Sequence, residues 1–302
     1  GHTIGLPHNM GSSFAYHVDS LRSPTFTANH GVAPSIMDYA RFNYVAQPED
    51  GVTNFYPRVG EYDIWSVKWG YSYFDGEDQN TEKEILNKWI KEKANNYQYW
   101  FGYSNGIDPR SQTESIGSDN MDASYYGLLN LKRIVPNLIN WTYEDGKNYD
   151  DLKELYLNVY SQFRRYIGHV STNVGGIYEN LKSSDQDGDV YTHVPKNLQK
   201  KAIAFLNSHV FSSLDWLVNR DVLSKIENIG AQERVRSIQE FALRRLFDYS
   251  RLARMLENES MNGKLAYSIN EMIIDLDKSI WGDLETASPT NIYNRNLQKS
   301  YI

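Results

Sequence analysis

The sequence predicts a mainly α-helical fold, and three observations lead to this class. Through most of the chain after residue 110, apolar residues recur every three or four positions, which is the period of one face of an α-helix. Residues that favour helix starts and stops, such as Asp119, Pro136 and Pro195, lie at the ends of these apolar stripes. No repeat of about 20 to 50 residues is apparent, so we expect the helices to form a bundle and not a solenoid.

Composition narrows the possible functions. A chain of 302 residues buries enough surface for one to three domains. Its net charge of −7 gives no electrostatic footprint for nucleic acid or for an anionic membrane surface. It contains no cysteine, which excludes disulfides and thiolate metal sites. No apolar run approaches the roughly 18 residues of a membrane-spanning helix, so no transmembrane segment is expected.

The first residues of the chain carry a pair of histidines around a glycine. His2 and His8 lie six positions apart with Gly5 midway, which matches the last part of the zinc signature H-E-x-x-H-x-x-G-x-x-H. In that signature the glycine ends a helix in the left-handed conformation, and the chain then turns a further histidine toward the same ion. A surface pair of histidines around a helix stop is the alternative interpretation.

A second segment, Ser35-Ile36-Met37-Asp38-Tyr39, resembles the Met-turn that follows this signature in metzincins. Together the two segments resemble the metzincin metallopeptidases. More closely, they resemble the C-terminal Met-zincin region of large bacterial zinc-dependent metalloproteases. The resemblance implies that His2 and His8 bind Zn²⁺ and that Met37 forms an apolar floor beneath them.

The same resemblance assigns roles to the residues around and after the turn. It implies that Tyr39 is a switchable zinc ligand or an oxyanion donor, and the alternative is a buried tyrosine that braces the turn. The pocket for the residue after the cleaved bond would be lined by Ala40, Arg41, Phe42 and Asn43.

We therefore interpret the chain as the C-terminal portion of a zinc-dependent metalloprotease, cut inside its zinc motif. The signature's first His ligand and its general-base Glu are not among these residues. The resemblance implies that the intact parent, which has both, hydrolyses peptide or protein substrates by zinc-activated water. This chain alone is expected to be inactive and a poor zinc binder. His2 and His8 are not expected to converge, because a helix cannot nucleate so near a chain end.

Two other classes of function stay open, and localisation depends on the resemblance alone. The alternatives are a non-catalytic helical interaction module and a carbohydrate-binding module. The resemblance implies a periplasmic, cell-surface or extracellular protein. We expect three regions: 1–50, the end of a metzincin-like catalytic domain; 51–110, an aromatic-rich connecting subdomain; and 111–302, an α-helical bundle extension.

Residues 60–103 are dense in aromatic side chains. We interpret them as the core of a subdomain, and the alternative is a platform for carbohydrate or peptide. Within this region Thr81 and Glu84 form a capping-box pattern that predicts a helix start. The aromatic residues are Tyr62, Trp65, Trp69, Tyr71, Tyr73, Phe74, Trp89, Tyr97, Tyr99, Trp100, Phe101 and Tyr103.

Four or five helices are predicted after residue 110. Ser118 or Asp119 caps the first, which Pro136 ends or kinks. A second helix runs to Gly168 as its stop, and the next has Pro195 at its first position. A long helix over 235–256 and a last one over 265–280 follow. Five arginines of the long helix lie mostly off its apolar face: Arg234, Arg236, Arg244, Arg245 and Arg254. We interpret them as a solvent-exposed face paired with neighbouring Glu residues, and the alternative is a binding site for an acidic partner.

Overall fold

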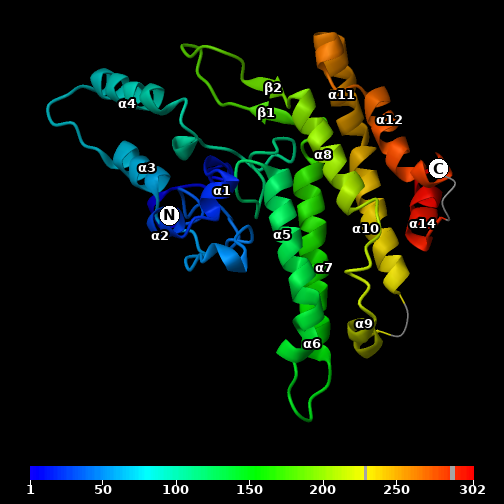
Figure 1. Ribbon diagram of the computed structural model, residues 1–302. Coiled ribbons are helices and arrows are strands. Elements are labelled where there is room, and N and C mark those ends of the chain that lie inside the picture. The colour runs from blue at the N-terminus through cyan, green and yellow to red at the C-terminus, as the bar shows by residue number, and fades with distance from the viewer. Residues whose placement is uncertain (228–229, 286–289) are drawn as a thin grey trace. The chain divides into compact units, whose positions relative to one another are not determined.

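The computed structural model describes residues 1–227, 230–285 and 290–302 and confirms the mainly α-helical class. The chain forms two compact units, shown in Figure 1. Unit 1 comprises Gly1–Tyr126 with Ile177–Thr192, and unit 2 comprises Gly127–Gly176 with His193–Ile302. Among the described residues the one sheet has two strands, β1 (Ile177–Glu179) and β2 (Tyr191–His193). The three regions expected from the sequence stay a prediction.

Unit 1 consists of short helices joined by long loops. Its buried apolar side chains come from the short helices, as Leu21 does, and from several of these loops, as Val45 and Ile116 do, so its core depends on the loops being anchored. The α-helices are α1 (Val18–Leu21), α2 (Pro24–His30), α3 (Glu61–Tyr71), α4 (Gln79–Lys93) and the start of α5 (Asn120–Ile134). The 3-10 helices are His2–Ile4, Ser12–Ala15, Pro48–Asp50 and Tyr97–Tyr99.

The aromatic region does not form the closed core that we predicted. Of its twelve aromatic residues only Tyr62 is buried, and no residue of α4 is. The helix α4 begins earlier than predicted, because the Asp78 carboxylate accepts hydrogen bonds from the backbone N–H groups of Asn80 (2.8 Å) and Thr81 (2.9 Å). The capping box at Thr81 was therefore a wrong prediction. An acidic side chain just before the first turn satisfies free N–H groups and matches the helix dipole.

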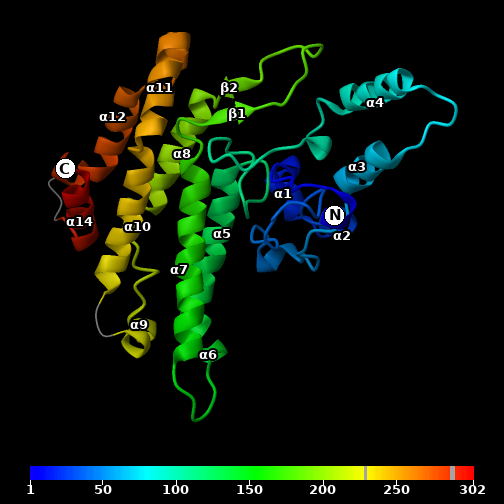
Figure 2. The ribbon, with the colours of Figure 1, turned by 180° about the vertical axis from the view of Figure 1, so that it is seen from behind.

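Unit 2 is a bundle of longer helices. The 22-residue helix α7 packs against α8 and α10, α8 packs against α12, and α10 packs against α14, as both views show (Figures 1 and 2). The predicted stripe of α7 is buried at Leu152, Tyr156, Val159, Phe163 and Ile167. The α-helices are the rest of α5, α6 (Leu138–Trp141), α7 (Asp150–Ser171), α8 (Lys196–His209), α9 (Arg220–Ile226), α10 (Ala231–Leu246), α11 (Tyr249–Asn262), α12 (Ile269–Ile280), α13 (Gly282–Glu285) and α14 (Ile292–Tyr301). The 3-10 helices are Val135–Asn137 and Gly263–Leu265.

Several predicted boundaries in unit 2 were wrong, and there are more helices than the four or five predicted. Pro195 is the N-cap of α8, which begins at Lys196, and the helix predicted over 265–280 begins at Ile269 and is followed by α13 and α14. Gly168 does not stop α7, which continues to Ser171. The single long helix predicted over 235–256 is two helices, because Asp248 caps α11 by accepting a hydrogen bond from the Arg251 N–H at 3.2 Å. An aspartate that caps a new helix ends the preceding one, although the apolar spacing continues across the break. The caps predicted at Asp119 and the end of α5 before Pro136 are confirmed.

Arginines from α10 and α11 explain why α7 extends past its glycine. Arg251 is buried and donates to the carbonyl oxygens of Ser171 (2.5 Å) and Val174, and Arg245 Nε donates to Ser171 Oγ at 2.7 Å. Burial, followed by the neighbouring charges of Arg245 and Arg254, lowers the pKa of Arg251 to about 9. Positive charge at a helix C-terminus satisfies its free carbonyls and stabilises its dipole. The interpretation as a solvated, Glu-paired face is therefore wrong for Arg245, and also for Arg254, whose Nε donates to the Gly175 carbonyl at 2.7 Å.

The same interpretation is confirmed for Arg236 and Arg244. Arg236 pairs with Glu233 at 2.6 Å, and Arg244 pairs with Glu240 at 3.1 Å. Arg234 is also paired with a glutamate, Glu227 at 2.5 Å, but its side chain is only 25% exposed, so the solvated part of the prediction is wrong for it. None of the described helices is long and apolar enough to cross a membrane.

Candidate metal centre

His2 and His8 converge, so the expectation that they would not is wrong. A 3-10 turn, His2–Ile4, ends at Gly5, whose backbone is left-handed as predicted (φ 79°, ψ 8°). The N–H of Gly5 donates to the His2 carbonyl at 3.0 Å and that of Leu6 donates to the Gly1 carbonyl at 3.2 Å, which closes the turn. The Nε2 atoms of the two histidines are 3.1 Å apart. A short glycine turn is therefore enough to bring them together, without a long helix.

The hydrogen bonds of the two rings define their tautomers. Nδ1 of His2 lies 2.9 Å from the carbonyl oxygen of Leu6, and Nδ1 of His8 lies 3.0 Å from that of Met37. A carbonyl oxygen only accepts, so each Nδ1 carries a hydrogen and donates it. In the neutral rings both Nε2 atoms then present lone pairs to each other. Two lone pairs at this distance repel unless a proton or a cation lies between them.

This donor pair fits a zinc ion. Two Zn–N bonds of about 2.0–2.1 Å at a tetrahedral angle place their nitrogens roughly 3.4 Å apart, close to the observed separation of 3.1 Å. Donation from the second ring nitrogen to a backbone carbonyl is the usual support for a histidine that binds a metal. Across residues 1–227, 230–285 and 290–302, no cluster of three or more His, Cys, Asp or Glu side chains is arranged to hold a metal ion. The described residues thus offer two nitrogen donors that fit a zinc ion, and not a complete metal site.

Met37 underlies the pair through both its backbone and its side chain. Its carbonyl oxygen accepts hydrogen bonds from His8 Nδ1 and from the Asn9 N–H, both at 3.0 Å. Its side chain is buried, and Met37 Sδ lies 1.9 Å from where a Cβ on Gly1 would stand. The methionine therefore packs directly against the first residue of the histidine turn.

Tyr39 lies beside the histidines. The centroid of its ring is 4.3 Å from that of His8, with 33° between the ring planes, and the residue is 52% exposed. This exposure excludes the alternative of a buried tyrosine that braces the turn. A phenol at the rim of the pair is placed where it can meet a bound ligand.

The helix α3 holds both halves of the centre. At its N-terminal end the buried Asp63 carboxylate accepts hydrogen bonds from Ser35 Oγ at 2.6 Å and from the Ile36 N–H at 2.9 Å. At its C-terminal end the Tyr71 hydroxyl donates to the Ile4 carbonyl at 3.0 Å. One rigid helix therefore fixes the Met-turn and the histidine turn relative to each other.

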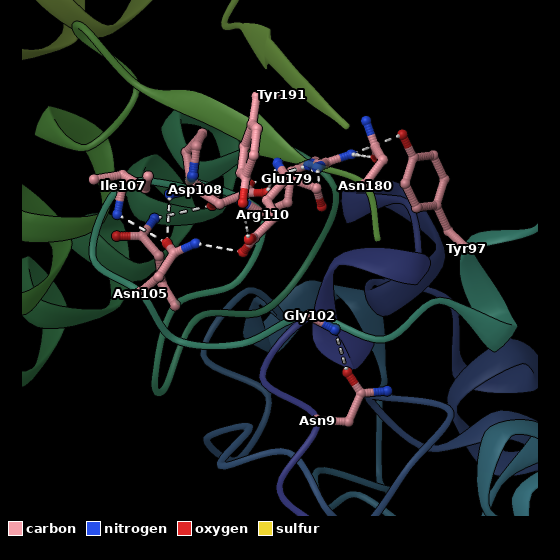
Figure 3. A network of polar contacts seen from close by, with 12 residues as sticks. Asn9, Tyr97, Gly102, Asn105, Ile107, Asp108, Arg110, Glu179, Asn180 and Tyr191 are labelled. Atoms are coloured by element: carbon pink, nitrogen blue, oxygen red, sulfur yellow. Dashed lines mark hydrogen bonds and ion pairs between the residues drawn. The ribbon is translucent and has the colours of Figure 1, made fainter. Parts of the chain in front are cut away.

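Asn9 ties the histidine turn to the aromatic region. Its side chain is fully buried, its Nδ2 donates to the Trp100 carbonyl at 2.8 Å, and its Oδ1 accepts from the Gly102 N–H at 3.0 Å (Figure 3). Oδ1 also accepts from the Gly11 N–H at 3.3 Å. Because Asn9 directly follows His8, these bonds fix the backbone that aims the His8 ring.

Arg110 anchors the aromatic region in turn. Its guanidinium lies 4.4 Å from the ring centroid of Trp100 and 4.3 Å from that of Tyr178, and it pairs with the buried Asp108 at 2.7 Å. It also donates to Asn180 Oδ1 at 3.0 Å, a contact that Figure 3 shows. The β1–β2 hairpin is thereby joined to residues 97–110.

Asp38, between Met37 and Tyr39, is a buried carboxyl of the Met-turn itself. Its Oδ2 accepts a hydrogen bond from the Ser13 N–H at 2.6 Å. Burial raises the pKa of this carboxyl to about 7, although the hydrogen bond from Ser13 opposes that change. The Met-turn is therefore joined to the segment that follows the histidine turn.

The predicted substrate pocket divides into exposed and buried residues. Arg41 is half-buried and Phe42 is 56% exposed, whereas Ala40 is half-buried and small. Asn43 is buried: its Nδ2 donates to the Leu21 carbonyl at 2.6 Å, and its Oδ1 accepts from two backbone N–H groups. The side chains that remain available to a ligand are thus Arg41 and Phe42.

Sequence reasoning missed the residues that support the pair. Asn9, Asp63 and Tyr71 each act on the centre through hydrogen bonds to distant segments, and their own neighbours in sequence give little sign of this. The one local signal was the position of Asn9 immediately after a candidate metal ligand, since residues that support such ligands are hydrogen-bonded in turn.

Comparison with known families agrees with this geometry. The sequence matches the family described as Met-zincin (DUF4953) over residues 1–288. This match spans nearly the whole chain, so the protein belongs to the Met-zincin family and is a metzincin-type zinc metalloprotease region. No curated protein and no solved structure matches the sequence.

Proposed function

We propose that His2 and His8 are two of the three protein ligands of a catalytic zinc ion, in a protein that hydrolyses peptide bonds. The observation that supports this most directly is the 3.1 Å separation of the two Nε2 atoms, with each Nδ1 within hydrogen-bond distance of a backbone carbonyl oxygen. The zinc signature also needs a further His and a general-base Glu. The signature places both upstream of His2, outside residues 1–302.

The residues of this chain then have separate roles. His2 and His8 hold the ion, while the Met37 carbonyl and α3 keep the two rings in place. A zinc ion in such a site lowers the pKa of a bound water and polarises a substrate carbonyl. Tyr39, exposed beside His8, donates a hydrogen bond to the oxygen on which negative charge develops. Peptide or protein chains are the substrates, and a periplasmic, cell-surface or extracellular setting is part of the same proposal.

Zinc binding by residues 1–302 provides the direct test. Two preoriented ligands should bind one zinc per chain weakly, and His2→Ala and His8→Ala should each abolish this binding. The matched control is His17→Ala, because His17 is an exposed histidine of the same unit that caps α1. Equilibrium dialysis with metal analysis measures the binding. Zinc retained by both variants, or lost equally in the control, contradicts the assignment.

Activity is tested in the complete protein. There, His8→Ala should remove zinc and peptide cleavage together, whereas residues 1–302 alone should cleave no peptide because they supply no general base. Cleavage by residues 1–302 that a chelator stops would contradict the proposed division of the site.

A second candidate function is supported by exposed aromatic residues. Tyr73 is 86% exposed and Trp69 is 37% exposed, and flat aromatic faces of this kind bind sugars. A glycan array probed with residues 1–302 tests this carbohydrate-binding function. Loss of a glycan signal in Tyr73→Ala and Trp69→Ala would favour it.

A further inference from the structure

Glu114 has an unusual backbone conformation. Within the described residues it is the non-glycine residue with a positive φ, at 65°. It is the third residue of a turn closed by the Ser115 N–H, which donates to the Gln112 carbonyl at 3.2 Å. Glycine adopts this position freely, whereas a side chain there costs about 1–2 kcal/mol. Strain of this kind persists where the side chain has a function.

The Glu114 side chain holds an arginine. Arg41 Nε donates to Glu114 Oε2 at 2.7 Å, with Arg41 40% and Glu114 23% exposed. A half-exposed pair of this kind contributes about 0–1 kcal/mol to stability, which does not exceed the strain at Glu114. The ion pair with Arg41 alone therefore does not offset this strain.

The bond to Glu114 leaves most of the guanidinium available. A guanidinium has five N–H donors, and its two terminal nitrogens match the two oxygens of a carboxylate. Within the described parts of the chain, the Arg41 side chain donates its hydrogen bond to Glu114, through Nε. Because Glu114 restricts the arginine's rotamers, less conformational entropy is lost when the terminal nitrogens bind a ligand.

Arg41 follows closely in the chain after Tyr39, the residue that contacts the candidate metal centre. It is two residues beyond Tyr39, a span of at most about 7 Å, and the Tyr39 ring contacts the His8 ring at 4.3 Å. The segment is fixed at its far end, where the N–H of Asn43 donates to the Phe55 carbonyl at 2.7 Å. An extended peptide advances about 3.3 Å per residue, so Arg41 can reach side chains within about three residues of a bond held at the histidines.

We propose that Arg41, positioned by Glu114, selects peptides that carry an Asp or Glu side chain within about three residues of the cleaved bond. The substrate carboxylate accepts two hydrogen bonds from the terminal nitrogens of Arg41, and the exposed Phe42 ring contacts the neighbouring apolar atoms. This inference rests on the proposed protease function, because it names the substrate class of the same site.

Cleavage of matched peptides by the complete protein tests the proposal. The peptides are identical except for Glu, Gln or Lys at one position, which is moved through the three places on either side of the cleaved bond. At the preferred position we expect kcat/KM to be about tenfold higher for Glu than for Gln. Arg41→Gln should reduce this ratio to near one, and Arg41→Glu should reverse the preference toward Lys.

Two further variants distinguish a role of the Arg41–Glu114 pair in substrate recognition from a purely structural role. Glu114→Gly relieves the strained turn and removes the pair, so it should leave the melting temperature unchanged or higher while it lowers the Glu:Gln ratio at least threefold. Arg22→Gln is the matched control, since Arg22 forms another carboxylate pair of unit 1, with Asp50 at 2.7 Å. It should lower stability without changing the ratio.

The outcomes distinguish the two proposals. Cleavage that ignores peptide charge in wild type, or a ratio unchanged in Arg41→Gln, overturns the role of Arg41 and leaves the protease function intact. If no peptide is cleaved, fluorescence anisotropy of the labelled peptides decides. Equal affinity for the Glu and Gln peptides overturns the inference, and tighter binding of the Glu peptide that Arg41→Gln abolishes supports it.

Discussion

The replacement Asn9→Ala should weaken zinc binding by residues 1–302 more than its effect on stability explains. The side chain is fully buried and makes three hydrogen bonds to backbone groups, at 2.8, 3.0 and 3.3 Å. Alanine leaves those groups unpaired, and net losses of about 1 kcal/mol per bond give roughly 2–4 kcal/mol of destabilisation. The freed backbone no longer aims the His8 ring, and loss of such support costs about tenfold to 100-fold in metal affinity.

The matched control is Asn43→Ala. Asn43 is also buried and makes three hydrogen bonds to backbone groups, at 2.6, 3.2 and 3.2 Å, but none of them reaches the histidine turn. Urea unfolding gives the loss of stability and zinc titration gives the loss of affinity. The two variants should lose similar stability, and Asn9→Ala alone should lose zinc. Equal zinc affinity in both variants would refute the reasoning that Asn9 positions His8.

Three other variants test separate parts of the structure. Tyr39→Phe in the complete protein should keep zinc and lower kcat, as measured by steady-state kinetics. An unchanged kcat would show that the Tyr39 phenol packs against its neighbours and takes no part in catalysis. Arg251→Met should destabilise unit 2 by about 2–4 kcal/mol in urea unfolding, since it leaves buried carbonyls at the end of α7 unpaired; a loss below about 0.5 kcal/mol would contradict that role. The hydrogen bond from Arg22 lowers the pKa of Asp50, so the pair stabilises the fold above about pH 4 and this contribution is lost as the pH falls through the lowered pKa. The difference in unfolding free energy between wild type and Asp50→Asn should therefore shrink toward low pH, and a difference independent of pH would count against the pair.

The helical fold could be predicted because its evidence is local. Apolar residues at helical spacing identify a buried face wherever the partner is another helix, as in α7. The break at Asp248 was not predicted, since the apolar spacing runs unchanged across it and the cap depends on one side chain. A close contact of α5 was also not predicted. A Cβ on Gly127 would lie 2.5 Å from the Tyr166 ring. Small residues mark a close helix contact that a search for large apolar residues overlooks.

The candidate centre could be predicted only where it is contiguous in sequence. His2, Gly5 and His8 form one motif, and Met37 lies in another. Their convergence near a chain end was not expected, because the sequence argument required a helix and the structure uses a glycine turn. The support from Asn9 depends on residues more than ninety positions away, at Trp100 and Gly102, and no pattern in the sequence specifies such a bond.

The discontinuity of unit 1 has a consequence for biosynthesis. Arg110 lies between Trp100 and Tyr178, and residues 177–192 belong to unit 1 although the 50 residues 127–176 belong to unit 2. A ribosome adding about 5–20 residues per second needs roughly 3–10 s to make that intervening stretch. For this interval the nascent chain carries Trp100 and Arg110 without the hairpin that covers them. Unit 1 therefore cannot finish folding as it is synthesised, and its completion awaits a segment made after the longest helix of unit 2.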